Sequence, residues 1–167
     1  MFIFLMTVSF TLFVQGAPPA ALQQLQFLLG DWQSIGSGKP EEGTGDFTFK
    51  ASLQNRVIVR TNHADYPASG GRPASRHEDL MVIYVEGEVV KADYHDSEGH
   101  VIRYTLQSPA AGEVAFVSDA AASAPRYRLT YKLGADKTLA GRFEIAPPGK
   151  PDAFSTYLSW SARKVGQ

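Results

Sequence analysis

Two histidines and a glutamate have a spacing that places them on one face of three neighbouring strands. If Glu86-Gly87 is a two-residue hairpin turn, Glu78 lies opposite His95. If Asp96–Gly99 is a four-residue turn, His95 lies opposite His100, and the three side chains form a row. Such a set suits a divalent metal ion, Zn²⁺ or Fe²⁺, or a general acid–base group. The alternative is a water-exposed polar rim with ordinary cross-strand pairs, and whether any catalysis occurs stays open.

The same register places His77 opposite Asp96, which predicts a charge-supported pair. Other catalytic patterns are missing from the sequence, which has no G-x-S-x-G, no P-loop, no H-E-x-x-H and no EF-hand loop. The sequence also has no cysteine, which excludes disulfides, thiolate metal ligands and cysteine nucleophiles. The histidine–glutamate row is therefore the main candidate for a catalytic or metal site.

Several tyrosines lie in runs where apolar and polar residues alternate. Each carries a hydroxyl group on an apolar ring, and such a side chain can orient a small apolar ligand. Arg60 and Arg103, together with Arg128, are further candidates, because an arginine inside a barrel can bind a carboxylate. The alternative is core packing for each tyrosine and an outward, solvated position for each arginine. The tyrosines expected to contact a ligand are Tyr84, Tyr94, Tyr104, Tyr131 and Tyr157.

The segments that must position these residues are short runs in which apolar and polar residues alternate. This pattern predicts half-buried antiparallel strands. We predict an all-β fold of about ten strands, preceded by a short helix over 20–29 and containing one longer loop, 66–75. A sheet of this length without covering helices must close on itself, which favours an up-and-down antiparallel barrel. The predicted strands are 32–38, 44–52, 55–64, 76–85, 88–95, 100–108, 113–118, 125–133, 138–146 and 153–164.

Residues 1–16 are predicted to be an export signal, because Phe2 to Val14 form an uncharged apolar run. The run is shorter than the roughly 20 residues of a membrane-spanning helix. Residues 17–167 are then one exported domain, periplasmic or secreted, with no cysteine for a lipid anchor and no stable membrane insertion. The alternative is that the apolar run is a buried N-terminal strand.

Charge and composition narrow the range of partners. The 167 residues contain 16 Lys+Arg and 17 Asp+Glu, for a formal net charge of -1, so no basic stripe is available for nucleic acid. Hydrophobic residues make up 44% of the chain, which is enough for a core without disulfides. The expected partner is a small hydrophobic molecule, and the oligomeric state stays open.

The start of the predicted barrel carries a recognisable motif. Gly30-Asp31-Trp32 resembles the G-x-W start of the first strand in the lipocalin and fatty-acid-binding-protein superfamily. The wider stretch, with Gly36 and Gly38, is similar to the glycine-rich first strand of nitrobindin-type haem-binding barrels, with Ser34 in place of one glycine. The chain also looks like lipocalin-like secreted bacterial proteins of unknown function in its LLGDW start, its YHDSEG turn and its final basic strand.

The resemblance implies roles for particular residues. Trp32 would plug the narrow end of the barrel, and Arg163 on the last strand would stack over it. Nitrobindin-type barrels hold haem through a histidine near the C-terminal strand, but none of the four histidines here lies in the last strand. Tyr157 would then be the axial ligand of a haem.

The function expected first is an exported lipocalin-like barrel that binds a small, mostly apolar ligand in its lumen, with the entrance near residues 66–75. One alternative is a metal-assisted or acid–base enzyme that uses Glu78, His95 and His100. A second alternative is a haem-binding barrel. A third is a structural or partner-binding module whose lumen is filled by the tyrosines and by Phe47, Phe49, Phe143 and Leu158.

Overall fold

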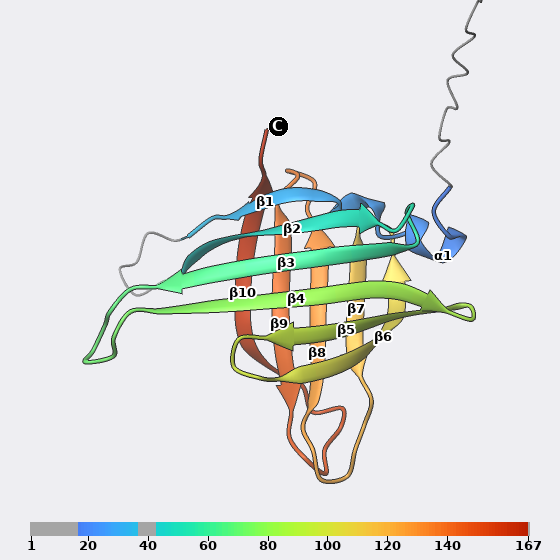
Figure 1. Cartoon of the computed structure of the whole chain (residues 1–167). Helices are drawn as coiled ribbons and strands as arrows, with labels where there is room; N and C mark the ends of the chain where they lie inside the picture. The colour runs from blue at the N-terminus through green and yellow to red at the C-terminus, as the bar shows by residue number, and fades with distance from the viewer. Residues whose placement is uncertain (1–16, 37–42, 167) are drawn as a thin grey trace, which may run out of the picture.

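A computed structural model describes residues 17–36 and 43–166, so the predicted export signal and the end of the predicted first strand lie outside it. The strands are β1 (Gly30–Ser34), β2 (Thr44–Ser52), β3 (Val57–Tyr66), β4 (Ser75–Glu86), β5 (Val89–Asp96), β6 (Val101–Ala110), β7 (Glu113–Ser118), β8 (Arg126–Leu133), β9 (Leu139–Ala146) and β10 (Ser155–Lys164). All neighbours are antiparallel, and β1 closes the barrel between β2 and β10 (Figure 1). The predicted all-β, up-and-down barrel of ten strands is confirmed.

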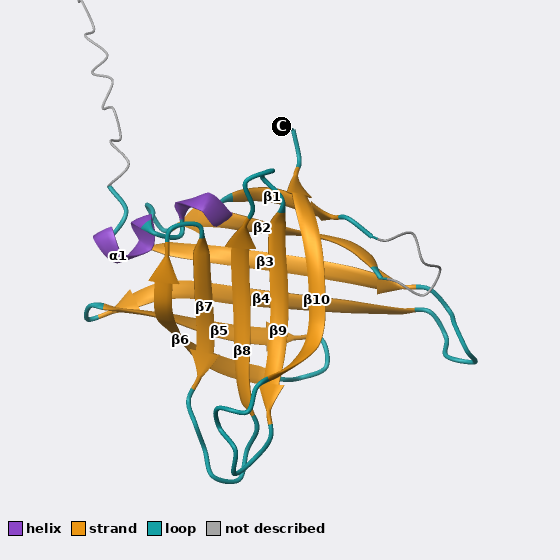
Figure 2. Ribbon diagram, turned by 180° about the vertical axis from the view of Figure 1, so that it is seen from behind, coloured by secondary structure: helices purple, strands orange, loops and turns teal. Residues whose placement is uncertain are grey.

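The barrel has two distinct ends. Strands β2 to β5 cross strands β7 to β10 at a steep angle, so the wall consists of two layers (Figures 1 and 2). Because successive strands alternate in direction, the β2–β3, β4–β5, β6–β7 and β8–β9 turns lie at the end that carries α1 (Ala20–Gln23). The β3–β4, β5–β6, β7–β8 and β9–β10 loops lie at the opposite end, which we name the mouth.

The helix before the barrel is shorter than predicted. Instead of one helix over 20–29, α1 is followed by a 3-10 turn, η1 (Gln26–Leu28). A 3-10 turn repeats every three residues, which brings Leu28 rather than Leu29 onto the buried side. Over residues 17–36 and 43–166, the structure contains no helix that could span a membrane. The segment from α1 to η1 buries three leucine side chains against the barrel, those of Leu22, Leu25 and Leu28.

Side chains fill the half of the barrel next to α1. Trp32 closes this end, with its indole Nε1 donating a hydrogen bond of 2.7 Å to the carbonyl of Leu28. Its ring stacks on Phe47 at 6.3 Å, and Tyr131 meets Phe49 edge-on at 5.4 Å. This half is therefore a packed core. The other inward side chains buried here include Ile58, Met81, Ile83, Val114, Phe116 and Leu139.

The cation beside Trp32 is a lysine, and the predicted stacking of Arg163 on this ring is wrong. Trp32 lies opposite Lys164 on β10, whose Nζ is 5.7 Å from the ring centroid. Arg163 lies opposite Gln33 on the outer face and is exposed. Because neighbouring residues of a strand point to opposite faces, a register offset of one residue exchanges the two basic side chains.

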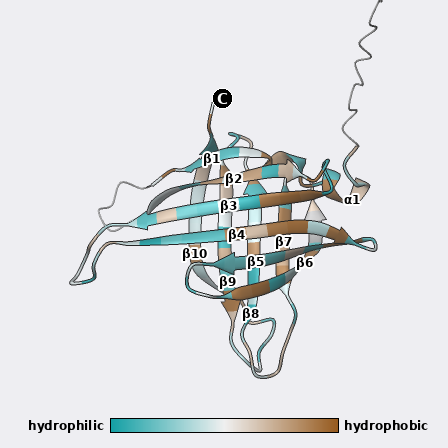
Figure 3. Ribbon diagram, viewed as in Figure 1, coloured by the Kyte–Doolittle hydropathy of each residue, from teal (hydrophilic) through white to brown (hydrophobic). Residues whose placement is uncertain are grey.

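Polarity changes along the strands that lead to the mouth. Figure 3 shows β3 and β4 as hydrophobic near α1 and hydrophilic toward the opposite end. In β3 the apolar residues give way to polar ones at Arg60, and in β4 the polar residues end at Asp79. The change affects inward and outward positions alike, so polar side chains also enter the lumen in the mouth half.

Candidate functional site

The β4–β5 turn differs by one residue from the predicted turn. Its two central residues are Gly87-Glu88, and the glycine has a φ of 63°. A glycine in the first central position is typical of the type II′ hairpin turn. His95 consequently lies opposite Leu80 rather than opposite Glu78.

The β5–β6 loop is also one residue shorter than predicted. Its three residues, Ser97–Gly99, lie between Asp96 and His100, and the glycine has a φ of 89°. The Oδ1 atom of Asp96 accepts hydrogen bonds from two backbone N–H groups of this segment, at 2.9 and 3.0 Å. These bonds favour the short loop, and they pair His95 with Val101.

The predicted row of Glu78, His95 and His100 is therefore not formed. Glu78 lies opposite His63 on the outer face, and His95 is exposed on the same face. His100 lies beside the loop, with its Nδ1 atom 2.9 Å from Oδ2 of Asp96. The row depended on the position of the first turn and on the length of the second, and each is off by one residue. The partners of His95 are consequently Leu80 and Val101 instead of Glu78 and His100.

An ion pair joins Arg60 and Asp79 inside the barrel, where the two side chains are 5% and 4% exposed. The amide of Asn62 donates a hydrogen bond of 2.9 Å to Oδ2 of Asp79, and the guanidinium lies 5.5 Å from the ring centroid of Phe47. Burial lowers the pKa of Arg60, but nearby groups, Tyr131 and Asp79 first among them, outweigh burial and raise it above its usual value. Arg60 thus points into the lumen, and Asp79 neutralises its charge.

Two buried polar atoms beside this ion pair have no hydrogen-bond partner among the described residues. They are Nε of Arg60 and the hydroxyl oxygen of Tyr131. Both side chains rest against Phe47, with 6.4 Å between the ring centroids of Tyr131 and Phe47. Burial raises the pKa of Tyr131 to about 12, so the hydroxyl stays protonated at neutral pH. Since an unsatisfied buried polar group costs about 1–3 kcal/mol, these two atoms favour a polar partner in the lumen.

Two more of the predicted tyrosines point inward. The rings of Tyr94 and Tyr104 meet edge-on at 6.5 Å, and burial raises the pKa of both hydroxyls well above the usual value. The Tyr94 hydroxyl lies 3.3 Å from Nε2 of His77 and 3.5 Å from Oδ2 of Asp96. Tyr94, Tyr104 and Tyr131 therefore supply the lumen with neutral hydroxyl groups.

The facing wall of the mouth is aromatic. Tyr127 stacks on Phe143 at 5.8 Å, and Tyr157 meets Phe143 edge-on at 6.2 Å. Deeper in the barrel, Trp160 meets Tyr131 edge-on at 6.0 Å. Tyr127, Phe143 and Trp160 are only partly buried, and Tyr157 is 74% exposed. Solvent therefore reaches the rings of the mouth half, in contrast to the packed half next to α1.

A purely structural module was expected to have a lumen filled with side chains, and only the half of the barrel next to α1 meets this expectation. Phe47 and Phe49 are buried, as that alternative requires. Phe143 is partly exposed and Leu158 is 44% exposed, so the mouth half is not sealed by these side chains.

Three other candidate residues lie outside the lumen. The Tyr84 hydroxyl donates a weak hydrogen bond of 3.4 Å to Asp93, and Arg103 lies opposite the same aspartate. Arg128 donates hydrogen bonds of 2.6 and 2.8 Å to Glu144. These side chains form ordinary cross-strand pairs on the outer face, so the structure does not bring them to a lumen ligand.

The lumen also contains polar residues that sequence reasoning did not select. Asp79 and Asn62 complete the polar wall, and Glu98 lies at its edge. His77 and Asp96, predicted to face each other, do lie together at the mouth, although their Cα atoms are not register partners. The change from apolar to polar residues within β3 and β4 was the sequence signal that could have pointed to these lumen residues.

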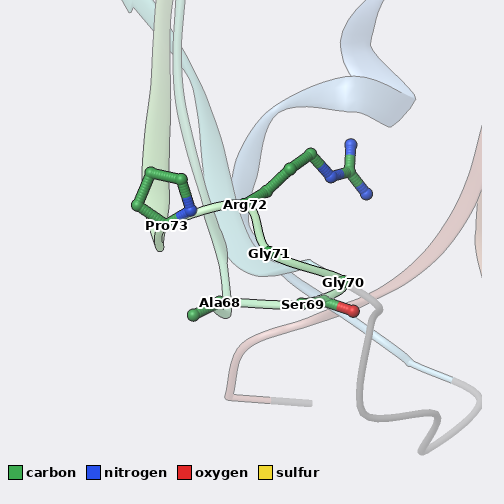
Figure 4. Close-up of a pocket in the computed structure, with 6 residues that line it drawn as sticks. All are labelled: Ala68, Ser69, Gly70, Gly71, Arg72 and Pro73. Atoms are coloured by element: carbon green, nitrogen blue, oxygen red, sulfur yellow. The ribbon is translucent and has the colours of Figure 1, made fainter.

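A hollow lies on the β3–β4 loop. This depression has a volume of about 470 Å³ and is lined by residues 68–73. Figure 4 shows these residues, with the Arg72 side chain extending away from the loop. Its walls come from six consecutive residues of one loop, which a backbone bridge between Ser69 and Arg72 holds. A binding site needs groups that converge from several elements, so this loop tip is not the candidate site.

Fold and lumen together define the class of protein. It is a closed up-and-down β-barrel, consistent with a calycin-type fold and compatible with ligand binding. Comparison of the chain with protein-family models and with curated proteins found no match in either set. The resemblance to lipocalin and nitrobindin barrels stays a prediction that rests on the first-strand motif.

Proposed function

We propose that the barrel binds a small, mostly apolar molecule in the mouth half of its lumen. The pair of unpartnered buried atoms, Nε of Arg60 and the hydroxyl of Tyr131, is the observation that carries this proposal. The apolar body of the ligand would lie against the partly exposed rings of Tyr127, Phe143 and Trp160. An apolar wall with a few converging polar groups is the usual composition of a small-molecule site.

The charge of the lumen favours a ligand with a neutral polar group. Asp79 already neutralises Arg60, so a ligand carboxylate would bring a second negative charge close to Asp79. A carbonyl or hydroxyl oxygen can instead accept a hydrogen bond from Nε of Arg60 or from Tyr131 without adding charge. The ligand class we propose is therefore a neutral apolar molecule with one hydrogen-bond acceptor.

The proposal includes export and leaves haem aside. The uncharged apolar run in residues 1–16 supports a periplasmic or secreted location. The residue expected to hold a haem iron, Tyr157, is 74% exposed and lies at the rim. A haem ligand in a barrel lumen should be buried, and Tyr157 is not.

The two tryptophans allow a direct test of lumen binding. Trp160 borders the lumen, whereas Trp32 is buried at the closed end, so the Trp32→Phe variant reports on Trp160 alone. We would titrate this variant with a ten-carbon ketone, the matching alcohol, the matching carboxylate and the alkane. The proposal predicts a saturable change in Trp160 emission, with the ketone and the alcohol binding more tightly than the carboxylate and the alkane.

A matched pair of tyrosine variants locates the polar contact. Tyr131→Phe should weaken ketone binding by about two- to tenfold, the loss of one hydrogen bond, while Tyr84→Phe on the outer face should leave it unchanged. Equal affinities for ketone and alkane, or equal effects of the two variants, would show that the buried polar atoms do not orient a ligand. No change in Trp160 emission with any of the four compounds would contradict lumen binding itself.

A further inference from the structure

A second polar cluster lies at the mouth, where the β5–β6 loop meets β4. His77, Asp96 and Glu98 each offer one metal-ligating atom, and these atoms all lie within 4.8 Å of one another. We propose that this cluster binds a divalent transition-metal ion of the Zn²⁺ class. The proposal does not depend on an apolar ligand, because none of the three side chains is among the unpartnered atoms of the lumen.

The distance between His77 and Glu98 matches that between two ligands of one ion. Bonds of about 2.0–2.2 Å in tetrahedral geometry place two ligand atoms about 3.4 Å apart. Nδ1 of His77 lies 3.2 Å from Oε1 of Glu98. Nδ1 of His100 lies 2.9 Å from Oδ2 of Asp96 and 3.8 Å from Oε2 of Glu98, so this exposed imidazole borders the cluster without belonging to it.

The surrounding residues hold His77 in the orientation that a metal ligand needs. Its Nε2 atom lies 3.3 Å from the Tyr94 hydroxyl and 3.5 Å from Oδ2 of Asp79, so Nδ1 is the nitrogen turned toward Glu98. A metal-bound histidine usually hydrogen-bonds a carboxylate or another polar group through its second nitrogen. Asp79 is itself fixed by the ion pair with Arg60, so this support is rigid.

The ligand types select the class of metal. Imidazole and carboxylate together suit Zn²⁺ and its first-row neighbours, whereas Ca²⁺ and Mg²⁺ prefer oxygen ligands alone. His63 provides a contrast on the outer face. Its two nitrogens point to different carboxylates, Nδ1 to Asp46 at 3.4 Å and Nε2 to Asp65 at 4.0 Å, and Asp65 is engaged by Arg76. That histidine bridges two acidic groups and does not converge with them on one point.

The test is calorimetric titration of the purified, EDTA-treated full chain with ZnCl₂, and with CoCl₂ for the visible spectrum of a tetrahedral site. We expect one ion per chain with micromolar or tighter affinity. Glu98→Gln is the principal variant, because this side chain is 62% exposed in a loop and its loss does not threaten folding. It should weaken zinc binding by about tenfold or more, and His77→Ala should abolish it.

Two control variants keep the result specific. Glu88→Gln alters an exposed turn at the opposite end of the barrel, and His63→Ala removes the histidine of the outer-face cluster. Both should bind zinc as the unaltered chain does. The proposal is overturned if the chain binds zinc no more tightly than millimolar, or if Glu98→Gln binds zinc as well as Glu88→Gln does. Binding lost in His63→Ala but kept in Glu98→Gln would place the ion elsewhere and would equally overturn it.

Discussion

Arg60 on β3 and Asp79 on β4 form an ion pair inside the barrel at the position where both strands change from apolar to polar residues. On the α1 side of this pair, the lumen is packed with rings and aliphatic side chains. On the other side, Asn62 and His77 continue the polar wall toward the mouth. The pair thus marks the boundary between the core and the candidate binding site.

Removing one member of this ion pair should be far more damaging than removing both. Asp79→Leu leaves the Arg60 guanidinium buried without a counter-charge, at a cost of about 3–5 kcal/mol in the free energy of unfolding. The double variant Arg60→Met/Asp79→Leu should recover most of this loss, because two apolar side chains can pack together in the same place. Urea unfolding measures all three proteins. A double variant as unstable as Asp79→Leu would show that the charges are not the cause.

The unpartnered hydroxyl of Tyr131 predicts a variant more stable than the original chain. Tyr131→Phe removes a buried hydroxyl that has no partner among the described residues, so the ligand-free protein should gain about 1 kcal/mol. Tyr84→Phe is the control, since the Tyr84 hydroxyl lies on the outer face and has a partner in Asp93. Thermal unfolding of ligand-free protein distinguishes the two variants. Destabilisation by Tyr131→Phe would show that the hydroxyl is satisfied in solution.

Gly141 is required by the ring that lies over it. A Cβ at this position would overlap the indole of Trp160, its cross-strand partner on β10. Gly141→Ala should therefore destabilise the barrel by about 1–3 kcal/mol and shift Trp160 emission to the red as the ring moves outward. In a double-mutant cycle with Trp160→Leu, the alanine should cost much less, because the overlap is gone. Additive effects of the two substitutions would contradict the predicted overlap.

Glu144 should make the barrel sensitive to acid. Hydrogen bonds from Arg128 lower the pKa of Glu144, whereas the pKa of a glutamate in an unfolded chain is about 4.3. A carboxyl group whose pKa is lower in the folded state stabilises that state above the unfolded pKa, and this contribution is lost as pH falls through the folded pKa. Glu144→Gln should reduce stability by about 1–2 kcal/mol at neutral pH, with the difference from the original chain fading below about pH 4.

Urea unfolding across this pH range measures that difference, with Glu113→Gln as the control. Glu113 pairs with Lys132 at 2.9 Å but is 40% exposed, so its loss should cost less than about 1 kcal/mol. A Glu144→Gln variant that remains equally destabilised in acid would show that the ion pair does not cause the pH dependence.

The two basic residues at the end of β10 should differ in their effect on stability. Lys164→Ala removes the cation 5.7 Å from the Trp32 ring centroid and should cost about 0.5–1 kcal/mol. Arg163→Ala changes an exposed outward side chain and should be nearly neutral. Chemical unfolding of the two variants shows which basic side chain stabilises the barrel through the Trp32 ring. A larger loss of stability in Arg163→Ala would support the stacking of Arg163 that the first-strand resemblance implies.

The fold was predictable from the sequence because a period of two is a local signal. The alternating runs around Phe47 and Tyr131 each report a half-buried strand without reference to distant residues. The same logic failed for the short helix, where the leucine spacing fits both an α-helix and the observed 3-10 turn. The presence of each strand was therefore more predictable than the exact form of the short helix.

The candidate site was less predictable because it depends on register. Whether Glu86 or Gly87 begins the β4–β5 turn moves the partner of His95 by two residues, from Glu78 to Leu80, and composition alone does not decide this. Glycine at the first central position, which is typical of a type II′ turn, would have favoured the observed Gly87-Glu88 turn. The inward direction of Arg60 could be inferred only once Asp79 was recognised as its partner on the neighbouring strand.

A native mass spectrum of the protein purified from its own host tests the central claim most directly. Binding in the lumen predicts one additional small mass per chain, in the range of an apolar metabolite or lipid fragment, and less of it in the Tyr131→Phe variant. A zinc adduct that Glu98→Gln removes would be a separate signal and would not replace that mass. A bare chain that also fails to bind the ketone and alcohol series would contradict ligand binding and leave the barrel as a structural or partner-binding module.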